Sequence, residues 1–170
     1  MTPPRPALWM IEDLEPFPDA PQVGEVSEPS TYWATPEMLE VPHELICEVS
    51  AQVEEVTIHG RTERVAHLGN GFTTMIPEGI DAMGETTLRG FLVWDRYLWI
   101  DYHTKPAGRV LVIERASLCR RANRTSTKHF GWYNVNHVGP ARLHRGESVP
   151  VNHDVVSYAL RVTPVGTQGE

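Results

Sequence analysis

The clearest pattern along the chain is an alternation of apolar and polar residues that begins at Glu44. Every second position is apolar over this segment, at Leu45, Cys47, Val49, Ala51 and Val53. A period of two predicts a β-strand with one buried face. The apolar phase then shifts by one residue to Val56 and Ile58, which is the shift that a β-bulge produces. We therefore expect a long, bent first strand of the kind found in small closed barrels.

Similar patterns predict further strands over residues 62–68, 72–76, 86–94, 110–113 and 156–162. Gly90 inside one of these strands indicates a bend or a close backbone approach. Residues 110–113 are apolar on both faces, which is typical of a central strand. Between residue 115 and the last strand lies a long, basic, His-rich stretch, for which we expect either another hairpin or a large loop.

Five or more strands, glycine bends and one long connection predict a mainly β fold. The preferred architecture is a small Greek-key, OB-like barrel, and the alternative is a two-sheet β-sandwich. The order of a long strand, a glycine-kinked strand, the segment Gly90-Phe91-Leu92-Val93-Trp94 and a basic insert before a final strand resembles small OB-like bacterial domains of uncharacterised function. The resemblance covers residues 44–163 and implies a fold but no activity.

The N-terminal part differs from the rest in composition. Residues 1–36 contain eight of the fourteen prolines among many acids, and proline removes backbone donors and fixes φ. We expect an acidic, Pro-rich N-terminal arm over residues 1–36, a β-barrel domain over residues 37–165 and a disordered tail over residues 166–170. The arm contains a short apolar cluster over residues 7–15, which either packs on its own domain or contacts a protein partner or a second copy.

Charge is distributed unevenly along the chain. Residues 1–60 contain twelve acids and one base, whereas residues 105–145 contain nine bases and one acid, within a net charge of −7. An acidic protein is a poor general nucleic-acid binder because phosphates require positive potential, but a basic segment can supply this locally. The asymmetry also predicts that the arm docks on its own barrel, on a second copy or on a partner.

The basic segment provides the main candidate site. It combines cations with aromatic side chains, namely Arg120, Arg121, Arg124, Lys128, Phe130, Trp132 and Tyr133. Cations neutralise phosphates and aromatic rings stack on bases. The preferred function is a non-catalytic binding module that recognises an anionic ligand, nucleic acid or an acidic protein segment through this basic aromatic loop. For the segment taken alone, the preferred interpretation is a solvated loop whose charge is balanced by the acidic arm. The two interpretations combine if the arm covers the basic face and is displaced by a polyanion.

The alternative function is a small β-barrel enzyme that acts on an organic substrate in an aromatic-lined pocket. Residues 94–103 hold the densest aromatic run of the chain. Asp101 and His103 would share a strand face there, and a carboxylate–imidazole pair can serve as a general base. No catalytic motif accompanies them, and the preferred interpretation of this segment is core aromatics capped by a surface ion pair.

Histidine and cysteine indicate no metal or cofactor. His129, His137, His144 and His153 are spaced eight, seven and nine residues apart, which matches no zinc pattern. Cys47 and Cys119 have apolar neighbours and are expected to be buried thiols in a reducing compartment. The sequence shows no long apolar segment and no secretory signal, so we expect a cytoplasmic protein without a membrane partner.

Overall fold

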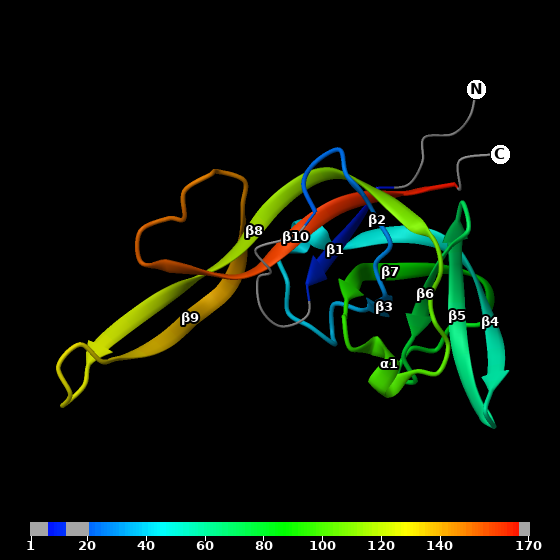
Figure 1. The fold of residues 1–170 in the computed structure, drawn as a ribbon, viewed down its shortest axis with the longest axis horizontal. Coiled ribbons are helices and arrows are strands. Elements are labelled where there is room, and N and C mark those ends of the chain that lie inside the picture. The colour runs from blue at the N-terminus through cyan, green and yellow to red at the C-terminus, as the bar shows by residue number, and fades with distance from the viewer. Residues whose placement is uncertain (1–6, 13–20, 167–170) are drawn as a thin grey trace.

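A computed structural model describes residues 7–12 and 21–166, which form a mainly β fold (Figure 1). The strands in this part of the chain are β1 (Leu8–Glu12), β2 (Val26–Ser27), β3 (Thr31–Ala34), β4 (Cys47–Ile58), β5 (Arg61–Gly69), β6 (Phe72–Ile76), β7 (Gly84–Trp94), β8 (Arg109–Ser126), β9 (Tyr133–His144) and β10 (His153–Val165). Two short helical segments, η1 (His43–Leu45) and α1 (Leu98–Asp101), connect some of them. Neither segment has the length and apolar character needed to cross a membrane.

Five strands close into a barrel. Their order is β7-β3-β6-β5-β4, and β4 pairs again with β7 to complete the ring. Within this ring β3 and β6 run parallel, whereas the other neighbours run antiparallel. The closed ring confirms the predicted small barrel over the alternative of a β-sandwich.

The remaining strands extend the sheet beyond the ring. β1 pairs with β7 on one side and with β10 on the other, and β10 pairs with β8. β8 and β9 form a hairpin that projects away from the barrel (Figure 1). We call the part of this hairpin from Ser117 to His144 the ribbon. The basic, His-rich stretch after residue 115, for which we expected either a hairpin or a large loop, is therefore a hairpin.

β1 corrects the prediction of an extended N-terminal arm. All five of its residues are buried. Leu8 and Met10 face the barrel core, while Trp9 and Ile11 face a second apolar cluster. A short run that is apolar on both faces is typical of a central strand. The prolines that predict an extended arm lie on either side of this strand and not within it.

The domain boundary expected at residue 36 therefore does not separate an arm from the barrel. β2 and β3 also precede it, and β3 is one of the five ring strands. The apolar side chains of residues 8–12 are buried in the sheet and so are not exposed for the self-association or partner contact predicted for residues 7–15. The rest of the expected arm, over residues 1–6 and 13–20, lies outside the described residues, as do residues 167–170 of the expected tail.

The predicted bulge in the first strand is also absent. β4 pairs with β7 and then with β5 in unbroken register. The apolar phase shifts because the covered face of the strand changes along its length. Val53 faces the barrel core, whereas Val56 packs beside the small cluster of Val65, Met75 and Leu98 under α1.

The base of the ribbon is anchored by the second apolar cluster. Leu118 of β8 and Ala159 of β10 are buried in this cluster, together with Trp9 and Ile11 of β1. Leu143 of β9 packs against its edge. Beyond this point the strands leave the core, so the barrel holds the ribbon by one end.

Gly90 lies where β7 changes partner, and the close approach predicted there is confirmed. β7 pairs with β4 up to Gly90 and with β3 and β1 beyond it. Its φ of +151° belongs to a region that side-chain-bearing residues rarely adopt, and an added Cβ would lie 1.9 Å from the carbonyl oxygen of Ala34. Only glycine therefore fits this junction.

We expect Gly90→Ala to lower the free energy of unfolding by about 3 kcal/mol or more, because backbone strain and overpacking add. Urea denaturation followed by tryptophan fluorescence measures the change. Gly79→Ala is the control, since nothing lies within 4 Å of its added Cβ, and its effect should stay within about 0.5 kcal/mol. Equal stability of the two variants would contradict this account of the junction.

Candidate functional site

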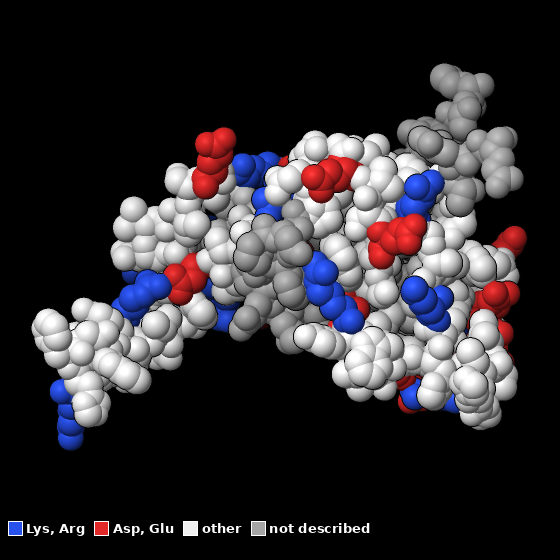
Figure 2. Space-filling model, in the orientation of Figure 1, with Lys and Arg blue, Asp and Glu red and all other residues white. Residues whose placement is uncertain are grey.

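The residues predicted to bind a ligand lie on the ribbon. Arg120, Arg121 and Arg124 belong to β8, Lys128 lies in the connecting turn, and Tyr133 begins β9. The ribbon contains five Lys or Arg residues and no Asp or Glu. Figure 2 shows that its far end is uncharged apart from one basic side chain. The ribbon thus combines five formal positive charges with no formal negative charge, although it holds only a third of the 15 Lys and Arg residues.

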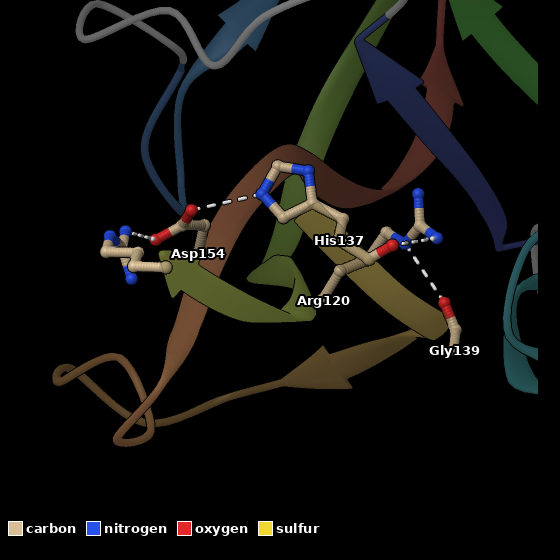
Figure 3. A network of polar contacts seen from close by, with 5 residues as sticks. Arg120, His137, Gly139 and Asp154 are labelled. Atoms are coloured by element: carbon tan, nitrogen blue, oxygen red, sulfur yellow. Dashed lines mark hydrogen bonds and ion pairs between the residues drawn. The ribbon is translucent and has the colours of Figure 1, made fainter. Parts of the chain in front are cut away.

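A backbone irregularity divides the ribbon into a base and an outer part. β9 places residues 139–141 opposite Arg120 alone, because Cys119 pairs with Arg142 and Arg121 pairs with Val138. The side chain of Arg120 lies beside these extra residues of β9 (Figure 3). Its Nε donates to the carbonyl of Gly139 at 3.0 Å, and a terminal nitrogen donates to that of His137 at 3.4 Å. Arg120 therefore ties its own strand to two backbone carbonyls of β9 beside the irregularity.

Arg124 is also engaged within the protein. It donates to one carboxylate oxygen of Asp154 at 2.6 Å, and His137 contacts the other at 3.0 Å. Asp154 lies on β10, so this network joins the three strands β8, β9 and β10 (Figure 3). The hydrogen bonds from His137 and Arg124 lower the pKa of Asp154 below its ordinary value. The carboxylate is therefore charged at neutral pH and offsets the charge of Arg124 on this side of the ribbon.

The opposite face of the ribbon carries cations without such partners. Side chains alternate between faces along a strand, so Arg121 lies opposite to Arg120 and Arg124. Within residues 7–12 and 21–166, no hydrogen bond or ion pair is made by the side chains of Arg121, Lys128 and Arg142. Arg142 was missed by the sequence analysis, because only the strand register shows that it lies beside Arg121. These three cations remain free to meet an anion.

The turn at the end of the ribbon exposes three aromatic side chains. The relative exposures of Phe130, Trp132 and Tyr133 are 104%, 72% and 60%. The turn itself is ordered by hydrogen bonds, since the backbone N–H of Thr127 donates to the carbonyl of Trp132 at 3.0 Å. The hydroxyl of Thr127 donates to the same carbonyl at 3.1 Å. The three rings lie within four residues of one another, and contiguous exposed apolar patches often mark an interaction site.

The alternative catalytic pair is not brought together. Asp101 and His103 are both exposed, and no hydrogen bond or ion pair joins these two described residues. The ring of His103 instead contacts that of His59, with ring centroids 5.7 Å apart. A cleft of about 280 Å³ beside α1 is lined by His103, Trp99 and Tyr102, but not by Asp101. The geometry supplies no oriented general base there.

Glu63 is the charged residue that fixes this region. Its side chain is only 2% exposed and accepts from the backbone N–H groups of His103 at 3.0 Å and Thr104 at 2.7 Å. Burial alone would raise the pKa of Glu63, but the hydrogen bonds from Thr104 and His103 outweigh it and the pKa lies below its ordinary value. No sequence pattern predicted this role of Glu63, which is structural.

The remaining clefts and polar clusters offer no stronger site. A cleft of about 710 Å³ is lined by Glu28, Lys105 and Arg109 and thus mixes both signs of charge. Among the described residues no three His, Cys, Asp or Glu side chains are grouped so as to hold a metal ion. Cys47 and Cys119 are free thiols, half-buried and buried respectively, and burial raises the pKa of each.

Comparisons with known protein families, curated protein sequences and solved structures find no match to this chain.

We expect Glu63→Gln to lower the free energy of unfolding at neutral pH by about 1–3 kcal/mol, because charged hydrogen bonds to two backbone donors are replaced by weaker ones. A carboxyl whose pKa is lowered by folding stabilises the protein above its unfolded pKa and loses this effect as the pH falls through its folded pKa. The difference between the two proteins should therefore shrink in acid. Urea denaturation at several pH values measures it, with exposed Glu85→Gln as control. A difference that does not change with pH would contradict this role.

Proposed function

We propose that this protein binds single-stranded nucleic acid through the ribbon and does so without catalysing a reaction. The observation that supports the proposal most directly is the combination of exposed aromatic rings and free cations on one projecting element. Phe130, Trp132 and Tyr133 supply the rings at the turn. Lys128 supplies positive charge in the same turn, and Arg121 supplies it further along β8 toward the barrel. Binding of single strands uses this pairing of stacking surfaces with a positive surface.

The charge distribution supports an anionic ligand. The ribbon holds five bases, whereas the rest of the chain holds ten bases and 22 acids. Two of the five ribbon cations are engaged internally, which leaves Arg121, Lys128 and Arg142. Each neutralised phosphate of a single strand contributes about −0.7 to the slope of log affinity against log salt. Three contacts therefore correspond to a slope of about −2.

The aromatic rings favour a single strand over a duplex. In a duplex the faces of the bases are already stacked on one another, whereas in a single strand they are free to stack on protein side chains. Phe130 and Trp132 project from a turn, and their exposure leaves both rings accessible to bases. The OB-like resemblance of the sequence supports the same ligand class by analogy of fold, since such barrels bind oligonucleotides. Here the proposed surface lies on an added ribbon.

We expect Trp132→Ala to weaken the binding of a fluorescently labelled oligothymidylate by about tenfold or more, because stacking on one aromatic ring contributes about 1–3 kcal/mol. Fluorescence anisotropy at fixed salt measures the dissociation constant. The control is Trp99→Ala, because Trp99 is 73% exposed on α1 and should not matter. A matched duplex should bind more weakly than the single strand.

Two results would contradict this proposal. Unchanged affinity of Trp132→Ala would show that the rings do not contact bases. Equally tight binding of polyglutamate, with no loss in Trp132→Ala, would show that the ribbon recognises acidic polypeptide by charge alone.

We expect Asp154→Asn to tighten oligothymidylate binding several-fold, because it removes a negative charge and releases Arg124. If the released guanidinium reaches a phosphate, the salt slope should steepen by about 0.7. Glu147→Gln is the matched control, since it removes one acid from the loop before β10 without releasing an arginine. Anisotropy titrations over a range of salt concentrations measure both quantities. Equal slopes for the two variants would show that Arg124 does not contribute.

A further inference from the structure

The face of the ribbon that carries Arg121 contains a cleft of about 460 Å³. It lies where β8, β9 and the start of β10 meet. Arg121 and Arg142 line it, together with His153, Asn152, Gly139 and Val151. The register explains the grouping, because Arg121 pairs with both Val138 of β9 and His153 of β10. Side chains of three strands thus converge on one cleft.

The irregularity in β9 helps to form this cleft. Residues 139–141 form the extra part of β9 opposite Arg120, and Gly139 has a φ of +77°. Gly139 and Pro140 line the cleft, while Arg120 holds the carbonyl of Gly139 from the other face. The position of Arg142 relative to Arg121 therefore depends on a backbone feature that Arg120 stabilises.

The two arginines of the cleft have no counter-ion in the described chain. The guanidinium groups of Arg121 and Arg142 make no hydrogen bond or ion pair with residues 7–12 or 21–166. Asp154 faces the opposite side of the sheet, where it already accepts from Arg124 and His137. Two like charges that line one cleft repel each other, and a bound anion removes this repulsion.

His153 and Asn152 add polar groups to the same cleft. The Nδ1 atom of His153 lies 2.8 Å from the carbonyl oxygen of Val151. A carbonyl only accepts, so Nδ1 carries the proton and Nε2 is the ring atom left to meet a ligand. Asn152 contributes an amide group, while its backbone carbonyl accepts from the N–H of Ala122 at 2.8 Å.

We propose that the cleft between Arg121 and Arg142 binds a phosphate group, either a phosphodiester of a nucleic-acid strand or a free phosphate ester. A guanidinium presents parallel N–H donors that match the oxygens of phosphate in pairs, and two of them line the cleft. The volume exceeds that of a phosphate alone, and Val138 and Val151 provide apolar wall for the organic part of an ester. This inference deepens the proposed function and rests on it only for the phosphodiester source.

The test uses the full chain and inorganic phosphate as the probe. Two-dimensional NMR of the arginine Nε–H groups reports binding at single residues. Titration with phosphate, against sodium chloride at equal ionic strength, should shift the signals of Arg121 and Arg142 in a saturable manner. The signal of Arg89, an exposed arginine on β7, should not shift. Equal shifts of all three signals, or none, would overturn the inference.

Substitution gives a second measurement. Arg121→Gln and Arg142→Gln should each weaken phosphate binding at least tenfold, and Arg89→Gln should leave it unchanged. Arg121→Lys should restore part of the affinity, because the charge remains but the paired donors are lost. Both residues are exposed, and amide spectra of the variants verify that they fold. Unchanged phosphate affinity in folded Arg121→Gln and Arg142→Gln would overturn the inference.

Oligothymidylate then distinguishes the two sources of phosphate and separates this inference from the proposed function. Competition between phosphate and the oligonucleotide, with both lost in Arg121→Gln, assigns the cleft to a nucleic-acid strand. Saturable phosphate binding without oligonucleotide binding assigns it to a free ester, in which case the proposed function fails and the cleft stands. If the oligonucleotide binds and requires Trp132, but phosphate does not bind in the cleft, the proposed function stands and the inference about the cleft fails.

Discussion

The fold depends on the close approach of two backbones at Gly90. At this residue β7 leaves its pairing with β4, which closes the ring, and begins its pairing with β3 and β1, which extends the sheet outward. A side chain here would collide with the carbonyl of Ala34. One strand can therefore serve two apolar clusters, with Leu92 in the barrel core and Phe91 and Val93 in the cluster beneath the outer strands. The outer strands join the sheet of the ring at this junction through β1, and Val110, Val112 and Leu160 of β8 and β10 also pack into the barrel core.

The alternation of side chains along β8 gives its cations two different roles. On one face Arg120 and Arg124 satisfy backbone carbonyls and the carboxylate of Asp154, and so connect strands that are no longer held by an apolar core. On the other face Arg121 is left free, beside Arg142 of the neighbouring strand. A two-stranded hairpin alone is marginally stable in water. The internal contacts of one face stabilise the ribbon, so the cations on the other face are not needed to hold its strands together.

The sequence predicts the strands that alternate cleanly and the glycine that bends one of them. β4, β5, β7 and β10 follow from their periodicity, because each has one face on a core, whereas β6 is a short run buried on both faces. β9 has no such pattern, since its first eight residues are exposed on both faces. β1 is apolar on both faces but short, so its place between β7 and β10 depends on long-range pairing that local pattern does not reveal.

The same limit applies to the candidate site. Composition alone located the basic aromatic segment, because its cations and rings are close together in sequence. Composition could not distinguish Arg120 and Arg124, whose side chains have internal partners, from Arg121, whose side chain has none. The irregular register of β8 and β9 decides which guanidinium meets a carbonyl. Nor could composition connect Arg142 and His153 to Arg121, because these residues meet only through pairing with β8.

The length of the ribbon has a consequence for a chain that is acidic overall. β10 accompanies β8 only as far as Arg121, and β8 continues to Ser126. Five residues of extended strand span about 17 Å, which is about two Debye lengths at physiological ionic strength. Mobile ions therefore screen much of the field of the acids on the barrel before it reaches the turn. A protein of negative net charge can thus present a locally cationic end to an approaching polyanion, as though that end belonged to a separate and smaller molecule.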